Sequence, residues 1–304
     1  MDGVSDGAVN PGSVPTAYAP PEGEPVDKRK NYPPAPEPLP VAVPDNHTHL
    51  DFRGGWVTVG IRDALDAAEA VGVPGAVQVG CDVQSSRFAV EAAAADRRLL
   101  AAVALHPNDV PALAERGELA GAIAEIDELA GHERVRAVGE TGLDYFRTGP
   151  EGRAVQRESF LAHLEIAARR GKALQIHDRD AHADVVDVLT SGVQLPDRVV
   201  FHCFSGDAEL ARICNEHGWF MSFSGTVTFK NSTDLQDALL VADPSLVLVE
   251  TDAPYLTPHP YRGRPNAAYM IPYTVRFMAR HLDRDLAEWC TILADTTRRV
   301  YGEF

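Results

Sequence analysis

The chain has 304 residues and a formal net charge of −16, with 45% hydrophobic and 24% charged residues. This length suits a single large α/β barrel, and the acidic balance argues against a broadly basic surface that coats nucleic acid. Four cysteines without a Cys-x-x-Cys pair argue against a disulfide framework, and the lack of about 18 consecutive uncharged apolar residues predicts a cytoplasmic protein without a membrane partner.

The first 40 residues differ in composition from the rest of the chain. They contain ten prolines and almost no run of large apolar side chains. Such a segment cannot bury enough surface to become ordered, so we predict a disordered proline-rich extension over residues 1–40. Residues 41–304 are predicted to form one domain. No protein partner can be identified from the sequence, and the extension is only a weak candidate for binding one.

From residue 41 onward, short apolar runs alternate with longer amphipathic segments, which is the pattern of repeated βα units. Three expected helices, 61–71, 157–170 and 208–217, are each followed by glycine. The eight expected strands are 41–46, 76–79, 99–105, 136–138, 173–176, 199–201, 220–222 and 246–249. Eight units in one run predict an α/β fold of the (β/α)8 TIM barrel type. A doubly wound sheet is the main alternative.

Potential metal ligands follow six of these expected strands. In strand order they are His47 and His49, His106, Glu140, His177, His202, and Asp252. The carboxyl ends of barrel strands meet at one face, and residues two apart on a strand point to the same side. His47 and His49 can therefore reach one cation. The whole set exceeds the needs of one ion and fits two neighbouring divalent ions.

Glu140 is the natural candidate for a carboxylate shared by the two ions. It lies between Gly139 and Gly142, which could let the backbone pack closely and leave room for cations. On this segment alone, a role in capping the following turn is slightly favoured over metal binding for Glu140. For Asp144, four residues further on, we expect a structural role.

The sixth and eighth strands add two expectations. Since adjacent residues on a strand point to opposite faces, Cys203 should face the helices when His202 faces the barrel lumen. By the same alternation, Glu250 should lie on the Asp252 side. An aspartate beside a metal-bound water can orient it or accept its proton, which indicates metal-assisted hydrolysis. Among residues 41–304, neither a Gly-x-Ser-x-Gly elbow nor a phosphate-binding P-loop motif occurs.

Taken together, these motifs resemble the TatD family of metal-dependent deoxyribonucleases. The resemblance runs from about residue 41 to the end of the chain. It rests on His47-Thr-His49-Leu-Asp51, Gly139-Glu-Thr-Gly-Leu-Asp144, Ile176-His-Asp-Arg179, Phe201-His-Cys-Phe-Ser-Gly206, Thr251-Asp-Ala-Pro-Tyr-Leu256 and Tyr261-Arg-Gly-Arg-Pro-Asn266. Two features depart from the family pattern. The proline-rich extension lies outside the usual core, and Thr296-Thr-Arg-Arg-Val-Tyr301 lacks an asparagine often found there.

The resemblance implies a barrel with two divalent ions, Mg²⁺, Mn²⁺ or Zn²⁺. It also implies hydrolysis of DNA, single-stranded or at its ends, by a 3′ to 5′ exonuclease or at abasic sites. The implied metal ligands are His47, His49, Glu140, His177, His202 and Asp252. The implied catalytic residues are Asp252, which would orient or deprotonate the attacking water, and Glu140. The candidates for contact with substrate phosphate are His106, Arg179, Ser205, Lys230 and Arg262.

Two other functions stay open on the sequence. The same barrel supports many chemistries, so the chain could instead hydrolyse a small phosphoester, lactone or amide. A non-catalytic binding protein that uses the proline-rich extension is a third possibility, because such segments can dock in aromatic grooves. Turnover of small substrates without degradation of DNA would distinguish the second hypothesis from the first.

Overall fold

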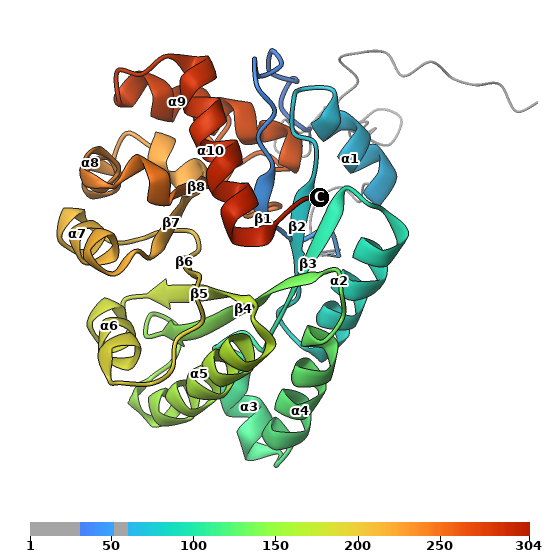
Figure 1. Ribbon diagram of the computed structural model, residues 1–304, viewed down its shortest axis with the longest axis vertical. Coiled ribbons are helices and arrows are strands. Elements are labelled where there is room, and N and C mark those ends of the chain that lie inside the picture. The colour runs from blue at the N-terminus through green and yellow to red at the C-terminus, as the bar shows by residue number, and fades with distance from the viewer. Residues whose placement is uncertain (1–30, 52–59) are drawn as a thin grey trace, which may run out of the picture.

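The computed structural model describes residues 31–51 and 60–304. Within these residues, eight parallel strands form one sheet in the order β1 to β8, as Figure 1 shows. The strands are β1 (Asp45–Thr48), β2 (Ala76–Val79), β3 (Leu99–Val103), β4 (Val135–Asp144), β5 (Ala173–Arg179), β6 (Val199–Phe201), β7 (Phe220–Phe223) and β8 (Val247–Val249). A parallel bridge between Thr48 and Ala253 joins the two edges. The predicted (β/α)8 TIM barrel is confirmed.

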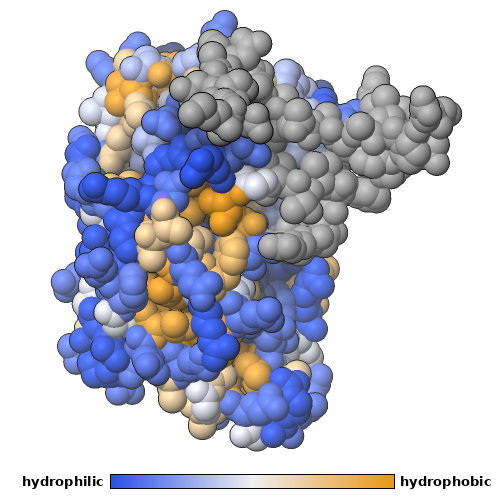
Figure 2. All heavy atoms as spheres, turned by 90° about the vertical axis from the view of Figure 1, so that its right-hand side faces the viewer, coloured by the Kyte–Doolittle hydropathy of each residue, from blue (hydrophilic) through white to orange (hydrophobic). Residues whose placement is uncertain are grey.

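Helices in the described residues cover the outside of this barrel. They are α1 (Ile61–Glu69), α2 (Val83–Ala95), α3 (Val110–Glu115), α4 (Leu119–Ala130), α5 (Pro150–Arg170), α6 (His182–Thr190), α7 (Ala208–His217), α8 (Thr233–Val241), α9 (Ile271–His281) and α10 (Leu286–Tyr301). On the face shown in Figure 2, the surface is mostly hydrophilic and is interrupted by a strip of hydrophobic side chains. Across residues 31–51 and 60–304, none of the helices combines the length and the hydropathy that a membrane span requires.

Local sequence explains where several helices begin and end. The carboxylate of Asp207 accepts hydrogen bonds from the backbone N–H groups of Glu209 and Leu210, which caps the start of α7. Helices α5 and α7 end at Gly171 and Gly218, which adopt left-handed φ angles of 63° and 69°. The predicted ends of these two helices are therefore confirmed. Helix α5 begins at Pro150, seven residues before the predicted start, because proline suits the first turn of a helix.

The largest extensions beyond the predicted strand ends are those of β4 and β5. β4 continues to Asp144 and β5 to Arg179, and they stay paired in register from Thr141 opposite Ile176 onward. The sequence prediction ended both strands where their apolar runs end, whereas backbone pairing continues through the polar residues that follow. These extensions carry polar side chains to the carboxyl end of the barrel.

Residues 31–40, which the sequence assigned to a disordered extension, lie against the C-terminal part of the chain. The Tyr269 hydroxyl donates to the carbonyl oxygen of Pro33 at 2.6 Å, and the Arg276 guanidinium donates to that of Pro38 at 3.0 Å. Leu39 is buried in the hydrophobic core. The boundary predicted at residue 40 therefore falls inside the packed chain. Residues 1–30 lie outside the described residues.

His163 of α5 anchors the segment that follows β3. Its Nε2 atom accepts a hydrogen bond from the backbone N–H of Leu105 at 3.1 Å, and its Nδ1 atom lies 2.7 Å from the carbonyl oxygen of Ser159. These partners require a neutral ring with the proton on Nδ1. Burial lowers the pKa of His163 from 6.5 to about 4.

We expect this histidine to make the protein less stable as the pH falls. Below pH 6.5 the unfolded state binds a proton that the folded state does not take up until about pH 4, so the free energy of unfolding decreases across this window. Between pH 7 and pH 5 the contribution is about 2 kcal/mol. Urea unfolding at both pH values should show a smaller decrease for the His163→Gln variant. The same decrease in both proteins would contradict this assignment.

Candidate metal centre

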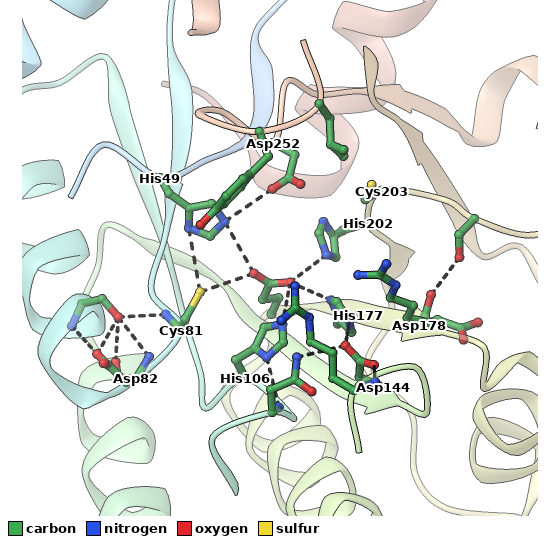
Figure 3. A pocket seen from close by; sticks show the side chains of 18 of the residues that line it. His49, Cys81, Asp82, His106, Asp144, His177, Asp178, His202, Cys203 and Asp252 are labelled. Carbon is green, nitrogen blue, oxygen red and sulfur yellow. Dashed lines mark hydrogen bonds and ion pairs between the residues drawn. The ribbon is translucent and has the colours of Figure 1, made fainter. Parts of the chain in front are cut away.

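The six predicted metal ligands converge at the carboxyl ends of the barrel strands. They come from β1 (His47) and the residue after it (His49), from β4 (Glu140) and β5 (His177), and from the segments that follow β6 (His202) and β8 (Asp252). Figure 3 shows the labelled side chains of His49, His177, His202 and Asp252 directed toward a common centre. The structure thus brings together residues that lie up to 205 positions apart in the sequence.

Four atoms form a first group of donors. The Nε2 atoms of His47 and His49 lie 3.2 Å apart, and Oε1 of Glu140 lies 3.7 Å and 3.5 Å from them. Oδ1 of Asp252 lies 3.8 Å and 3.5 Å from the same two nitrogen atoms. Ligands bound tetrahedrally at about 2.1 Å from a zinc ion are about 3.4 Å apart. The spacing of this group therefore fits one divalent ion.

A second group of donors surrounds the other oxygen of the same carboxylate. Oε2 of Glu140 lies 2.8 Å from Nε2 of His202 and 3.0 Å from Nδ1 of His177. His106 is not one of these ligands, and its Nε2 atom lies 3.6 Å from the same oxygen. Glu140 thus presents one oxygen to each group. This arrangement favours the interpretation of Glu140 as a shared ligand over that of a cap for the following turn.

Backbone contacts position the residues of both groups. The N–H of Asp252 donates to the carbonyl oxygen of His47 at 2.9 Å, so the bonds that close the barrel also hold two candidate ligands together. On the other side, a Cβ atom at Gly142 would lie only 2.1 Å from the carbonyl oxygen of His177. The glycine therefore allows β4 and β5 to approach closely, as the sequence suggested, and brings Glu140 beside His177.

The charges of the site are mutually dependent. Burial alone would raise the pKa of Glu140, but His202, His106 and His177 outweigh it and hold this pKa well below its usual range. Burial would lower the pKa of His202, but Glu140 and Glu250 raise it well above the usual value. Glu140 is therefore ionised at neutral pH and can bind a cation without first losing a proton.

Glu250 contacts the second group through the ring nitrogen of His202 that faces away from Glu140. Its Oε1 atom lies 3.3 Å from Nδ1 of His202 and accepts the backbone N–H of Cys203 at 2.7 Å. This contact orients the His202 ring so that Nε2 faces Glu140. Glu250 therefore reaches the site, as strand alternation predicted, and acts on it through His202.

The expectation for Cys203 is wrong, and that for Asp144 is correct but incomplete. Cys203 lines the pocket instead of facing the helices, because β6 ends at Phe201 and the left-handed φ of 41° at Cys203 breaks the strand alternation. Asp144 has a structural role, since it accepts the backbone N–H of Arg147 at 2.8 Å. It also enters the site, because its Oδ2 atom lies 3.2 Å from Nε2 of His177.

Sequence reasoning missed Cys81 as a member of the site. Its thiol donates to Oε1 of Glu140 at 3.4 Å, and its sulfur atom lies 3.8 Å from Nδ1 of His49. Burial raises the pKa of this thiol to about 12, so it is protonated at neutral pH. The sequence offered one signal for Cys81: like the other candidates, it comes shortly after an expected strand.

The four loop residues expected to contact phosphate divide into two pairs. Arg179 and Ser205 line the pocket, which has a volume of about 650 Å³, and the hydroxyl of Ser205 donates to the carbonyl oxygen of Asp178 at 2.8 Å. Lys230 and Arg262 are not among the lining residues of the described chain. The Arg262 guanidinium lies 4.4 Å from the centre of the Phe229 ring.

Arg147 lines the pocket although sequence reasoning did not select it. It lies three residues beyond the end of β4, in the turn that Asp144 holds. Arg147 and Arg179 are both exposed, and neither forms an ion pair with a carboxylate in the part of the chain that the structure describes. The mouth of the pocket thus offers two guanidinium groups to an anion.

Known proteins resemble this chain in sequence over most of its length. A family model described as "TatD related DNase" matches residues 44–302. The chain is 46% identical over 262 residues to "Uncharacterized metal-dependent hydrolase TatD" of Mycobacterium tuberculosis, covering 85% of this chain and 97% of that protein. It is 32% identical to "Uncharacterized metal-dependent hydrolase YabD" of Bacillus subtilis, covering 84% and 98% of the two chains.

Solved structures share the fold at lower identity. The crystal structure of YJJV, a TatD homolog from Escherichia coli K12, superposes with a TM-score of 0.77 at 23% identity, covering 86% of this chain and 98% of that one. A TatD family hydrolase from Entamoeba histolytica superposes with a TM-score of 0.74 at 17% identity, covering 88% of this chain and 100% of that chain. At these identities the likeness supports the barrel fold.

Proposed function

The chain belongs to the TatD-related DNase family of metal-dependent hydrolases, and we propose that it cleaves phosphodiester bonds of DNA at the centre around Glu140. The observation that carries this proposal is the position of the Glu140 carboxylate, whose two oxygens face two separate groups of donors. Two divalent ions bound there would supply Lewis acidity at both the attacking and the leaving oxygen of a displacement at phosphorus and would acidify water.

Asp252 is the proposed proton acceptor for the attacking water. Burial alone would raise its pKa, but the contact with His49 and the nearby rings of His47 and His202 keep this pKa below its usual value. Its carboxylate is therefore ionised at neutral pH. Because it lies at the edge of the first donor group and lines the pocket, it can orient water and accept its proton.

His106 is suited to contact the substrate phosphate. Its Nδ1 atom accepts the backbone N–H of Asn108 at 3.1 Å, so the neutral ring carries its proton on Nε2, the atom that faces the centre. Burial lowers the pKa of His106 to about 4, which keeps the ring neutral at pH 7. An N–H donor there can bind a phosphate oxygen, and Arg147 and Arg179 add charge at the mouth of the pocket.

The test is an assay with 5′-labelled single-stranded DNA in Mg²⁺, Mn²⁺ or EDTA. We expect cleavage that depends on the metal ion, and a ladder that shortens from the 3′ end would identify a 3′ to 5′ exonuclease. A parallel duplex with one abasic site tests endonuclease activity at that site. Intact DNA under every metal ion, together with turnover of a small phosphoester, lactone or amide, would overturn the proposal in favour of a small-molecule hydrolase.

The donor set also predicts which metal ion binds most tightly. Four imidazole rings and two carboxylates suit Zn²⁺ and Mn²⁺, whereas Mg²⁺ prefers oxygen ligands and retained water. After dialysis against equimolar Mg²⁺, Mn²⁺ and Zn²⁺, mass spectrometry should find Zn²⁺ or Mn²⁺ in excess over Mg²⁺ in the protein. This holds even where Mg²⁺ supports turnover. Preferential uptake of Mg²⁺ would count against the imidazole ligands.

A further inference from the structure

An exposed aromatic side chain contacts Arg179, a residue that lines the pocket of the metal centre. Phe146 follows β4 by two residues and is 61% exposed. Of the described residues, it is one of only three large hydrophobic side chains with such exposure, together with Tyr255 and Leu240. A single exposed hydrophobic side chain is not unusual in itself, so the role of Phe146 depends on what its ring contacts.

Arg179 holds this ring in place. Its guanidinium carbon lies 4.0 Å from the centre of the Phe146 ring, which is the geometry of a cation–π contact. Arg179 also lines the metal pocket, so it joins the exposed ring to the site. Since no carboxylate of the described chain pairs with Arg179, its charge remains available to a phosphate group beside the ring.

A second aromatic side chain lies on the other side of the centre. Tyr255 follows β8, is 47% exposed and lines the pocket, and its ring centre lies 6.5 Å from that of His49. The strand order places β4 and β8 on opposite sides of the barrel. The aromatic groups of Phe146 and Tyr255 therefore stand on opposite sides of the donor atoms around Glu140.

We propose that Phe146 is a stacking platform for a nucleobase of single-stranded DNA, with Arg179 binding the adjacent phosphate and Tyr255 forming the opposite wall. This inference rests on the proposed DNase function and makes its substrate more specific. Stacked bases alternate with phosphates along a single strand, as the ring of Phe146 and the guanidinium of Arg179 do at the pocket mouth. Bases stack on aromatic rings with little sequence preference, so we expect cleavage with little dependence on base identity.

The test measures binding of a fluorescein-labelled single-stranded DNA octamer to the full chain by fluorescence anisotropy in EDTA, where metal-dependent cleavage does not consume the probe. The Phe146→Leu variant should bind about tenfold more weakly, and Phe146→Tyr should bind within about twofold of the unmodified protein. Leu240→Ala removes an exposed side chain of α8 and serves as the matched control, with unchanged affinity.

A second probe distinguishes loss of base stacking from loss of affinity for the sugar-phosphate backbone. With an octamer of abasic nucleotides, the unmodified protein and Phe146→Leu should bind equally, because no base is present to stack.

In Mn²⁺, cleavage of the normal octamer by Phe146→Leu should show a KM raised about tenfold with kcat within about twofold. A Phe146→Leu variant that binds and cleaves the normal octamer like the unmodified protein would overturn the inference alone. An equal loss of affinity for both probes would do the same. A chain that neither binds nor cleaves DNA overturns the proposed function as well.

Discussion

Replacement of Glu140 by glutamine is expected to lower kcat for phosphodiester cleavage by at least about 10³-fold while the chain stays folded. The amide keeps the shape of the side chain but removes its charge, and only one of its two terminal atoms can still act as a ligand. Since Oε1 and Oε2 of Glu140 face different donor groups, one of the two groups loses its shared oxygen. The measurement is kcat, with the metal content of the same samples determined by mass spectrometry.

The matched control is Glu216→Gln, which removes a carboxylate from the exposed end of α7. It should have the activity and the metal content of the unmodified protein. Circular dichroism should show the same helix content in both variants. A Glu140→Gln variant with normal kcat and normal metal content would exclude a shared carboxylate and with it the two-ion interpretation.

Replacement of Gly142 by alanine is expected to reduce the free energy of unfolding by about 4 kcal/mol. The added Cβ atom would lie 2.1 Å from the carbonyl oxygen of His177, and this oxygen belongs to the backbone of β5. Neither strand can move aside without breaking the pairing of Gly142 with His177. The φ angle of 142° at Gly142 adds conformational strain for any residue with a side chain.

Urea unfolding of the metal-free proteins measures this effect. Gly121→Ala is the matched control, since a Cβ atom at this position of α4 would meet no other atom within 4 Å. It should leave the protein equally stable or raise its stability by up to about 1 kcal/mol, because alanine favours the helix more than glycine does. Equal stability of the two alanine variants would refute the close approach of β4 and β5.

The barrel was predictable because its strands are buried on both faces and appear in the sequence as short apolar runs. The same signal failed at the ends of β4 and β5, where polar residues continue the pairing as far as Asp144 and Arg179. Hydrophobicity identifies the part of a strand that packs in the core. It does not identify the polar end of the strand, where the residues of the site lie.

The candidate ligands were predictable because each follows an apolar run in the sequence, and a barrel gathers the carboxyl ends of its strands at one face. The environment of the site depended on features without such a signal. The side chain of Cys203 lines the pocket because the backbone at this residue has a left-handed φ angle. Arg147 lines it from a turn that a hydrogen bond to Asp144 stabilises. Lys230 and Arg262, like Arg179, were expected on loops after strands, but they are not among the lining residues of the pocket in the described chain.

The packing of residues 31–40 on the barrel has a consequence for how this segment can change during evolution. Its polar anchors are main-chain carbonyl oxygens, which Tyr269 and Arg276 reach through their side chains. A carbonyl oxygen is present whichever amino acid supplies it. Mutations in the segment can therefore accumulate at its exposed positions without loss of attachment, whereas selection to keep the segment in place acts on the residues of the barrel that hold it.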